Sequence, residues 1–168
     1  ADMAKKLARI YGEDPDKAYF AGYVHDIAKC LSIEEANRLV RYYGLGGKYL
    51  YDLNLAHSKI GAALAEELLN VNDAEVLNAI CYHTTARAEM TCLEEILYVA
   101  DAIEINRTYK EASILREKAK YNLDEVCLFI LDFCIEDLKK KNRFVDRDTI
   151  DAREWIYNKI KKRSLNEK

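Results

Sequence analysis

The feature that most constrains the fold is that neither glycine nor proline occurs after Gly61 in this 168-residue chain. The six glycines and the single proline all lie at or before that position. A chain that folds into sheets needs a tight turn about every 8 to 12 residues, and glycine and proline supply most such turns. So long a segment without either residue predicts an all-α fold, and the length fits one compact domain.

Capping residues mark where the helices begin. Asp14 before Pro15 is typical of an N-cap followed by the first helical residue, and Ser32 with Glu35 forms a capping box. The capping-box pattern recurs at three further places: Asn72/Glu75, Thr91/Glu94 and Asn122/Glu125. Together with the helical spacing of apolar residues, these patterns predict helices over residues 2–12, 15–30, 33–43, 55–70, 73–85, 92–105, 108–119, 122–141 and 148–163.

The composition argues against several classes of protein. A net charge of −3 is not the basic balance expected of a nucleic-acid-binding protein. No apolar run reaches the roughly 18 residues that a membrane span needs. Five cysteines without a C-x-x-C pair fit free thiols, with Cys127 and Cys134 in the core. We therefore expect a cytoplasmic protein that has neither a nucleic-acid nor a membrane partner.

Residues 42–54 are expected to form a loop, because this stretch holds three of the six glycines. Its tyrosines either stack on a nucleobase or pack as half-buried rings. If the bundle moves to admit a ligand, residues 44–54 are the first place where we expect the movement. The lysines at 139–141 are expected to end a helix that faces solvent.

The three histidines of the chain, His25, His57 and His83, all lie in stretches predicted to be helical, beside apolar neighbours. One histidine in such a place is usually a core residue, but two carboxylates share this setting. Asp101 interrupts the apolar run 96–103, and Asp26 directly follows His25. A buried carboxylate is costly unless it meets a cation, a metal or hydrogen-bond donors, so these acids need partners.

Imidazole and carboxylate groups without thiolates form the ligand set of iron, manganese, zinc or a related divalent ion. The side chains of consecutive residues on a helix point about 100° apart. His25 and Asp26 would therefore share an ion only if it lay close against the helix, in the notch between the two side chains. A bound metal lowers the pKa of water and polarises a phosphoryl oxygen, which suits hydrolysis. Lys29 and Arg107 lie near this set and either hold a polyphosphate or remain solvated.

Several segments resemble a known family. Residues 21–29, Ala-Gly-Tyr-Val-His-Asp-Ile-Ala-Lys, resemble the signature of the HD-domain metal-dependent phosphohydrolases. The segments around His57, His83 and residues 98–107 are similar to the YqeK-type symmetrical bis(5′-nucleosyl)-tetraphosphatases, which split diadenosine tetraphosphate into two ADP. Asp148-Thr149, Ala152-Arg153 and Trp155 also resemble that group, so the similarity covers nearly the whole chain.

The resemblance implies a single HD domain over residues 1–168, with a metal core at about 15–107 and helices within 108–168 that close a nucleotide pocket. It implies iron, with manganese, cobalt or magnesium as alternatives, held by His25, Asp26 and Asp101. It gives catalytic roles to Asp26, His57 and His83, or places the two histidines on a second metal. The nucleotide-binding residues that it implies are Lys29, His57, His83, Thr84, Arg107, Phe144, Val145, Asp148 and Thr149.

Departures from the family pattern are concentrated at two places. The family's metal set begins with an earlier histidine, whereas none precedes His25 here. We expect that ligand in a segment upstream of Ala1, and the alternative is a lost ligand. Ala102, Ile105 and the pair 146–147 stand where the family often has Tyr, Pro and His-Pro.

The predicted function is symmetrical hydrolysis of dinucleoside tetraphosphates by metal-activated water. The alternatives are another HD-superfamily nucleotidase or phosphodiesterase and a catalytically inactive nucleotide-binding module. A helical regulator of DNA is disfavoured by the net charge. The native metal, the preference for adenine or guanine, and the formation of a homodimer stay open at this level.

Overall fold

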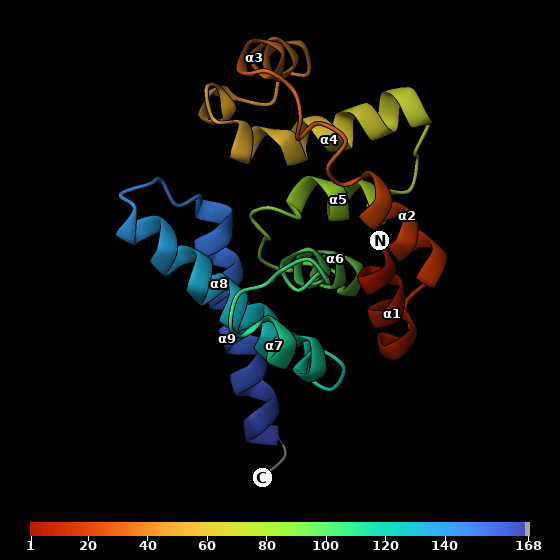
Figure 1. Cartoon of the computed structure of the whole chain (residues 1–168), viewed down its shortest axis with the longest axis vertical. Helices are drawn as coiled ribbons and strands as arrows, with labels where there is room; N and C mark the ends of the chain where they lie inside the picture. The colour runs from red at the N-terminus through yellow and green to blue at the C-terminus, as the bar shows by residue number, and fades with distance from the viewer. Residues whose placement is uncertain (167–168) are drawn as a thin grey trace.

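The computed structural model describes residues 1–166, and within this range it contains helices and no strand. This confirms the predicted all-α class. The elements in chain order are α1 Asp2–Tyr11, α2 Pro15–Val24, α3 Ile33–Tyr42, the short 3₁₀ helix η1 Gly47–Tyr49, α4 Leu53–Leu69, α5 Ala74–Tyr82, α6 Cys92–Ala102, α7 Ala112–Lys118, α8 Leu123–Lys140 and α9 Arg147–Asn166 (Figure 1).

Helix α6 lies at the centre of the bundle and packs against α1, α2, α5 and α8 (Figure 1). Its residues from Leu93 to Ala100 are all buried, as expected for a helix surrounded by other helices. Thr91 caps its start by accepting a hydrogen bond from the amide of Glu94. The carboxyl end of this central helix carries Asp101.

Helix α3 packs on α4 and η1 and forms a second, smaller core with them. The predicted loop falls here, and its tyrosines differ in their surroundings. Tyr49 is buried in the small core, whereas Tyr42 and Tyr51 are largely exposed. The packing interpretation of the loop tyrosines therefore holds for Tyr49.

The helix predicted over residues 15–30 ends at Val24, and residues 25–30 form consecutive turns. At this end, the Nδ1 of His25 bonds the carbonyl oxygen of Gly22 at 2.9 Å. That carbonyl is the one that the amide of residue 26 would use in a continued helix. The helix predicted over 73–85 ends in the same manner at Tyr82, where the Nδ1 of His83 bonds the carbonyl oxygen of Ile80 at 2.7 Å. Asp73, not Asn72, caps that helix.

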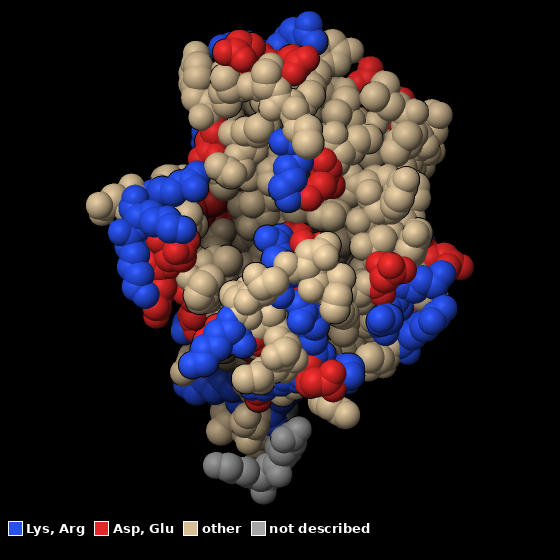
Figure 2. Space-filling model, in the orientation of Figure 1, with Lys and Arg blue, Asp and Glu red and all other residues tan. Residues whose placement is uncertain are grey.

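The C-terminal helices are joined to the bundle by ion pairs. Lys159 of α9 contacts Glu95 of α6 at 3.1 Å and Asp124 of α8 at 2.6 Å. Helix α8 ends at Lys140, and basic side chains gather over this end in Figure 2, as predicted for the lysine run. The five cysteines are free, with Cys127 buried and Cys134 partly buried. No helix in residues 1–166 is long and apolar enough to cross a membrane.

Candidate active site

The three histidine rings are oriented by the backbone. Each Nδ1 lies within hydrogen-bond distance of a carbonyl oxygen: His25 to Gly22 at 2.9 Å, His57 to Leu53 at 3.0 Å and His83 to Ile80 at 2.7 Å. A carbonyl oxygen only accepts, so we assign the proton of each neutral ring to Nδ1. The three Nε2 atoms are then left as lone-pair donors for a cation or as proton acceptors.

The Nε2 atoms converge around the carboxylate of Asp26. Its Oδ1 lies 3.4 Å from His57 Nε2 and 3.5 Å from His83 Nε2, and its Oδ2 lies 3.4 Å from His25 Nε2. The Nε2 atoms of His57 and His83 are 3.1 Å apart. Asp101 approaches from the end of α6, with its Oδ1 3.7 Å from His25 Nε2. Residues from four separate segments therefore meet at one point.

Turns and helix ends, rather than a helix face, deliver these groups. His25 and Asp26 lie in the turn after α2, which corrects the expectation that they share a notch on a helix. His83 follows the last residue of α5, and His57 lies in the second turn of α4. Gly61 lets α4 approach the turn, because a Cβ at this position would lie 3.3 Å from the carbonyl oxygen of His25.

The donor set fits a divalent metal ion. Ligand atoms of His25, Asp26 and His83 lie within 4.8 Å of one another. His25 Nε2 and Asp26 Oδ1 are buried and have no hydrogen-bond partner in the part of the chain that the structure describes. Buried lone pairs that face one another are costly unless a cation or a proton lies between them. This compact trio includes His83, where the sequence analysis expected Asp101.

The surroundings keep both carboxylates ionised. Burial raises the pKa of Asp26, but contacts with His57, His83 and Lys29 outweigh it and hold the pKa well below its usual range. Burial also opposes ionisation of Asp101, but His25 and Arg107 lower its pKa to about 2. Two anionic carboxylates are therefore present at neutral pH, as metal binding requires.

The pKa values of two histidines move in opposite directions. Burial lowers the pKa of His25, but the nearby carboxylates of Asp101 and Asp26 outweigh burial and raise it overall. Burial dominates at His83 and lowers its pKa, despite the contact with Asp26. The neutral form of His83, with a free Nε2 lone pair, is thus favoured.

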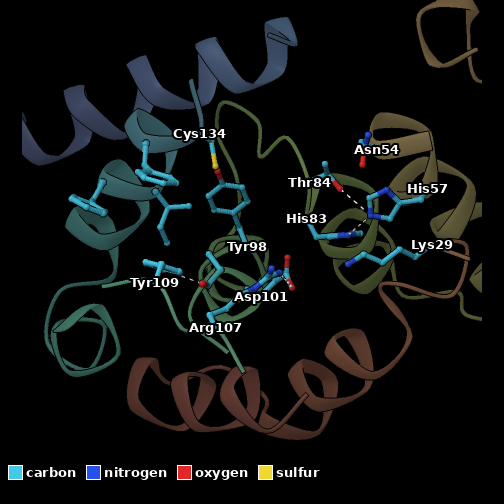
Figure 3. Close-up of a pocket in the computed structure, with 14 residues that line it drawn as sticks. Lys29, Asn54, His57, His83, Thr84, Tyr98, Asp101, Arg107, Tyr109 and Cys134 are labelled. Atoms are coloured by element: carbon cyan, nitrogen blue, oxygen red, sulfur yellow. Dashed lines mark hydrogen bonds and ion pairs between the residues drawn. The ribbon is translucent and has the colours of Figure 1, made fainter. Parts of the chain in front are cut away.

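A cavity of about 400 Å³ opens beside this cluster and is partly lined by His57, His83 and Asp101 (Figure 3). Two cations flank it: Lys29 contacts Asp26 at 2.6 Å, and Arg107 contacts Asp101 at 3.2 Å. The Oγ1 of Thr84 lies 3.4 Å from His57 Nε2. The structure thus places Lys29, Thr84 and Arg107 beside the histidine cluster.

The C-terminal part of the expected nucleotide site lies elsewhere. Phe144, Val145, Asp148 and Thr149 are not among the residues that line the cavity. Ion pairs hold this segment against η1 instead, with Lys48 2.9 Å from Asp146 and 3.8 Å from Asp148. In this structure residues 144–149 therefore do not close over the pocket. From the predicted loop, only Asn54 lines the cavity.

Sequence reasoning missed the wall of the cavity opposite the histidines. Tyr109, Phe129 and Phe133, together called the aromatic wall here, line the cavity beside Tyr98 and Cys134. Figure 3 shows Tyr98, Tyr109 and Cys134 across the cavity from His57 and His83. Phe129 and Phe133 are four residues apart on α8 and therefore share a face. That spacing is the one signal in the sequence that could have indicated the wall.

An all-helical bundle whose His-Asp doublet meets further histidines and an aspartate defines the class of protein. The family model described as "HD domain" matches residues 1–106. A solved structure from Clostridium acetobutylicum, described as a predicted HD superfamily hydrolase involved in NAD metabolism, has the same fold. It matches with a TM-score of 0.89 and 38% identity, over 94% of this chain and 85% of that one.

Two curated relatives identify the family more specifically. The symmetrical bis(5′-nucleosyl)-tetraphosphatase of Staphylococcus aureus is 38% identical over 90% of this chain and 80% of that protein. The protein of the same name from Bacillus subtilis is 34% identical over 92% of this chain and 84% of that protein. The chain belongs to the HD-domain family and, within it, to the family of these symmetrical bis(5′-nucleosyl)-tetraphosphatases.

Proposed function

We propose that this protein is a metal-dependent hydrolase that cleaves dinucleoside tetraphosphates symmetrically and converts diadenosine tetraphosphate into two ADP. The observation that carries the proposal is the meeting of three imidazole Nε2 atoms and two ionised carboxylates at one end of a cavity that two cations flank. The names of the curated relatives support this choice of substrate. Five free thiols support a cytoplasmic location.

The proposed metal ligands are His25, Asp26 and Asp101, with His83 close enough to join them. A bound divalent ion supplies positive charge at a phosphoryl oxygen and makes a coordinated water acidic enough to react near neutral pH. Iron is the proposed metal, and manganese, cobalt and magnesium are the alternatives.

The other residues of the cluster bind phosphate and move protons. Lys29 and Arg107 neutralise phosphate oxygens and place the bond to be cleaved beside the histidines. His57 presents an unprotonated Nε2 atom, which accepts a proton from the attacking water and returns one to the leaving ADP. His83 can take this role only where its Nε2 is not bound to the metal. Asp26 remains anionic and stabilises either histidine when it becomes protonated. The proposed site does not include residues 144–149.

Product analysis tests the proposal. Protein loaded with iron or manganese is incubated with diadenosine tetraphosphate, and ADP is expected as the only nucleotide product. Asp26→Asn should lower kcat more than about 100-fold, beyond the 10- to 100-fold typical of residues that only orient a metal ligand. Asp151→Asn, at a surface ion pair with Arg147, is the matched control and should retain wild-type activity. AMP with ATP as products, or equal activity of Asp26→Asn, would overturn the proposal.

A further inference from the structure

We infer that the aromatic wall, Tyr109, Phe129 and Phe133, is a stacking subsite that binds one nucleobase of the substrate without distinguishing adenine from guanine. The inference rests on the proposed function for the identity of the ligand. Its structural basis is separate, because it depends on the apolar end of the cavity and not on the histidine cluster.

The wall is built as an exposed aromatic surface. Phe133 is 55% exposed and Phe129 is 42% exposed, although both are large apolar residues. Helix α8 buries its other face through residues such as Cys127 and Leu131. The core therefore does not require the two phenylalanines, and an exposed aromatic pair that lines a cavity is typical of a ligand-binding surface.

The rings are held in a stacking geometry. The rings of Tyr109 and Phe133 lie 6.3 Å apart between centroids with an interplanar angle of 16°. The Tyr109 hydroxyl donates a hydrogen bond to the carbonyl oxygen of Ala102 at 3.0 Å, which fixes this ring (Figure 3). A flat base can extend this parallel stack at little entropic cost, because the protein rings that it would contact are already ordered.

The wall and the cationic end belong to one cavity. Arg107 lines the cavity two residues before Tyr109, and its guanidinium contacts Asp101 of the cluster. A ligand that spans both ends needs an anionic group joined to a flat apolar group. A nucleoside diphosphate unit has this chemistry, with its phosphates at Lys29 and Arg107 and its base on Phe133.

The polar atoms near the wall are already engaged. The Tyr109 hydroxyl donates to the carbonyl of Ala102, and Tyr98 is buried. Stacking does not depend on which base is present, because every base has a π face. Discrimination between adenine and guanine requires hydrogen bonds to the base edge, so similar use of both purines is expected.

Steady-state kinetics with two substrates tests the subsite. For diadenosine and diguanosine tetraphosphate, Phe133→Ala and Phe133→Leu should both raise KM by about 10-fold with kcat within about twofold, and Phe133→Tyr should restore KM. Tyr121→Ala, an 84% exposed ring outside this cavity, is the control and should match the wild type. A wild-type KM for Phe133→Ala or for Phe133→Leu would overturn stacking. A more than tenfold difference in kcat/KM between the two substrates would overturn base tolerance.

A binding measurement separates this inference from the proposed function. Calorimetric titration with ADP and with inorganic pyrophosphate reports the base and the phosphates independently of turnover. Phe133→Ala should weaken ADP binding about 10-fold and leave pyrophosphate binding unchanged, even if the wild type cleaves no tetraphosphate. Unchanged ADP binding, or equal weakening of both ligands, would overturn the inference.

Discussion

The Nε2 atoms of His57 and His83 lie 3.1 Å apart, and neither ring has a proton to place between them when both Nδ1 atoms donate to backbone carbonyls. Two buried lone pairs at this distance destabilise the fold unless a cation or an additional proton intervenes. Asp26 Oδ1, 3.4 to 3.5 Å from both atoms, supplies a third lone-pair donor. Removing this strain is a physical reason why metal binding should stabilise the protein.

We therefore expect a divalent metal to raise the thermal stability. At a free metal concentration of about 100 times Kd, Tm should rise by about 5 °C or more, and chelation should reverse the shift. His83→Gln should abolish most of the shift, because it removes a member of the compact ligand trio. Calorimetric scans with and without manganese measure this effect. An equal Tm with and without metal would contradict the account of the cluster.

Gly61→Ala separates metal affinity from fold stability. The new Cβ would lie 3.3 Å from the carbonyl oxygen of His25 and displace the turn that carries the HD doublet. Alanine is a better helix former than glycine by about 1 kcal/mol, and this gain opposes the cost of displacing the turn. The Tm of the metal-free protein should therefore change little. Metal affinity should fall about 10-fold in a fluorescence or calorimetric titration. Gly47→Ala, which meets no atom within 4 Å, is the control, and equal affinity of both variants would refute this positioning role.

Arg107→Gln tests the cationic end of the cavity. Loss of the guanidinium removes positive charge beside the phosphates, and kcat/KM for diadenosine tetraphosphate should fall about 100-fold. Arg147→Gln serves as the control, because Arg147 forms a surface ion pair with Asp151 and lies outside the cavity. If both variants kept the wild-type kcat/KM, Arg107 would have no part in binding the substrate.

Glu95 should make the stability of the fold depend on pH. Burial and the charge of Asp124 raise its pKa from 4.5 to about 7, although Lys159 opposes the shift. Between these values the folded state holds a proton that the unfolded state has lost, so stability falls as pH rises through this range. Denaturant titrations of Glu95→Gln should show a smaller loss between about pH 5 and about pH 8 than the wild type. Equal losses would mean that Glu95 does not carry the effect.

Much of the fold could be predicted because its determinants are local. Side chains such as Asp14 and Ser32 cap the first turn of their own helices, so the sequence indicates those helix starts directly. The sequence does not indicate the end of α2, where the ring of His25 bonds the carbonyl of Gly22. No glycine or proline marks that point, and helical periodicity continues past it.

The candidate site likewise has residues that the sequence indicated and residues that it did not. The types of His25, Asp26 and Asp101 indicated a metal-binding set, since buried imidazoles and carboxylates need a cation. The spacing of Phe129 and Phe133 is the one sequence signal for the aromatic wall, but it does not show that these rings are exposed, because α8 carries more apolar residues than one face can bury. Only the packing of α8 against α6 and α9 decides that Phe133 is exposed to the cavity.

Hydrolysis of diadenosine tetraphosphate in ¹⁸O-labelled water tests the central claim most directly. If water attacks the phosphorus beside the central bridge, the products are two ADP molecules, and one of each pair carries a single ¹⁸O on its β-phosphoryl group. Mass spectrometry of the products measures this distribution. Label found in AMP, ATP or inorganic phosphate would contradict symmetrical cleavage by this site.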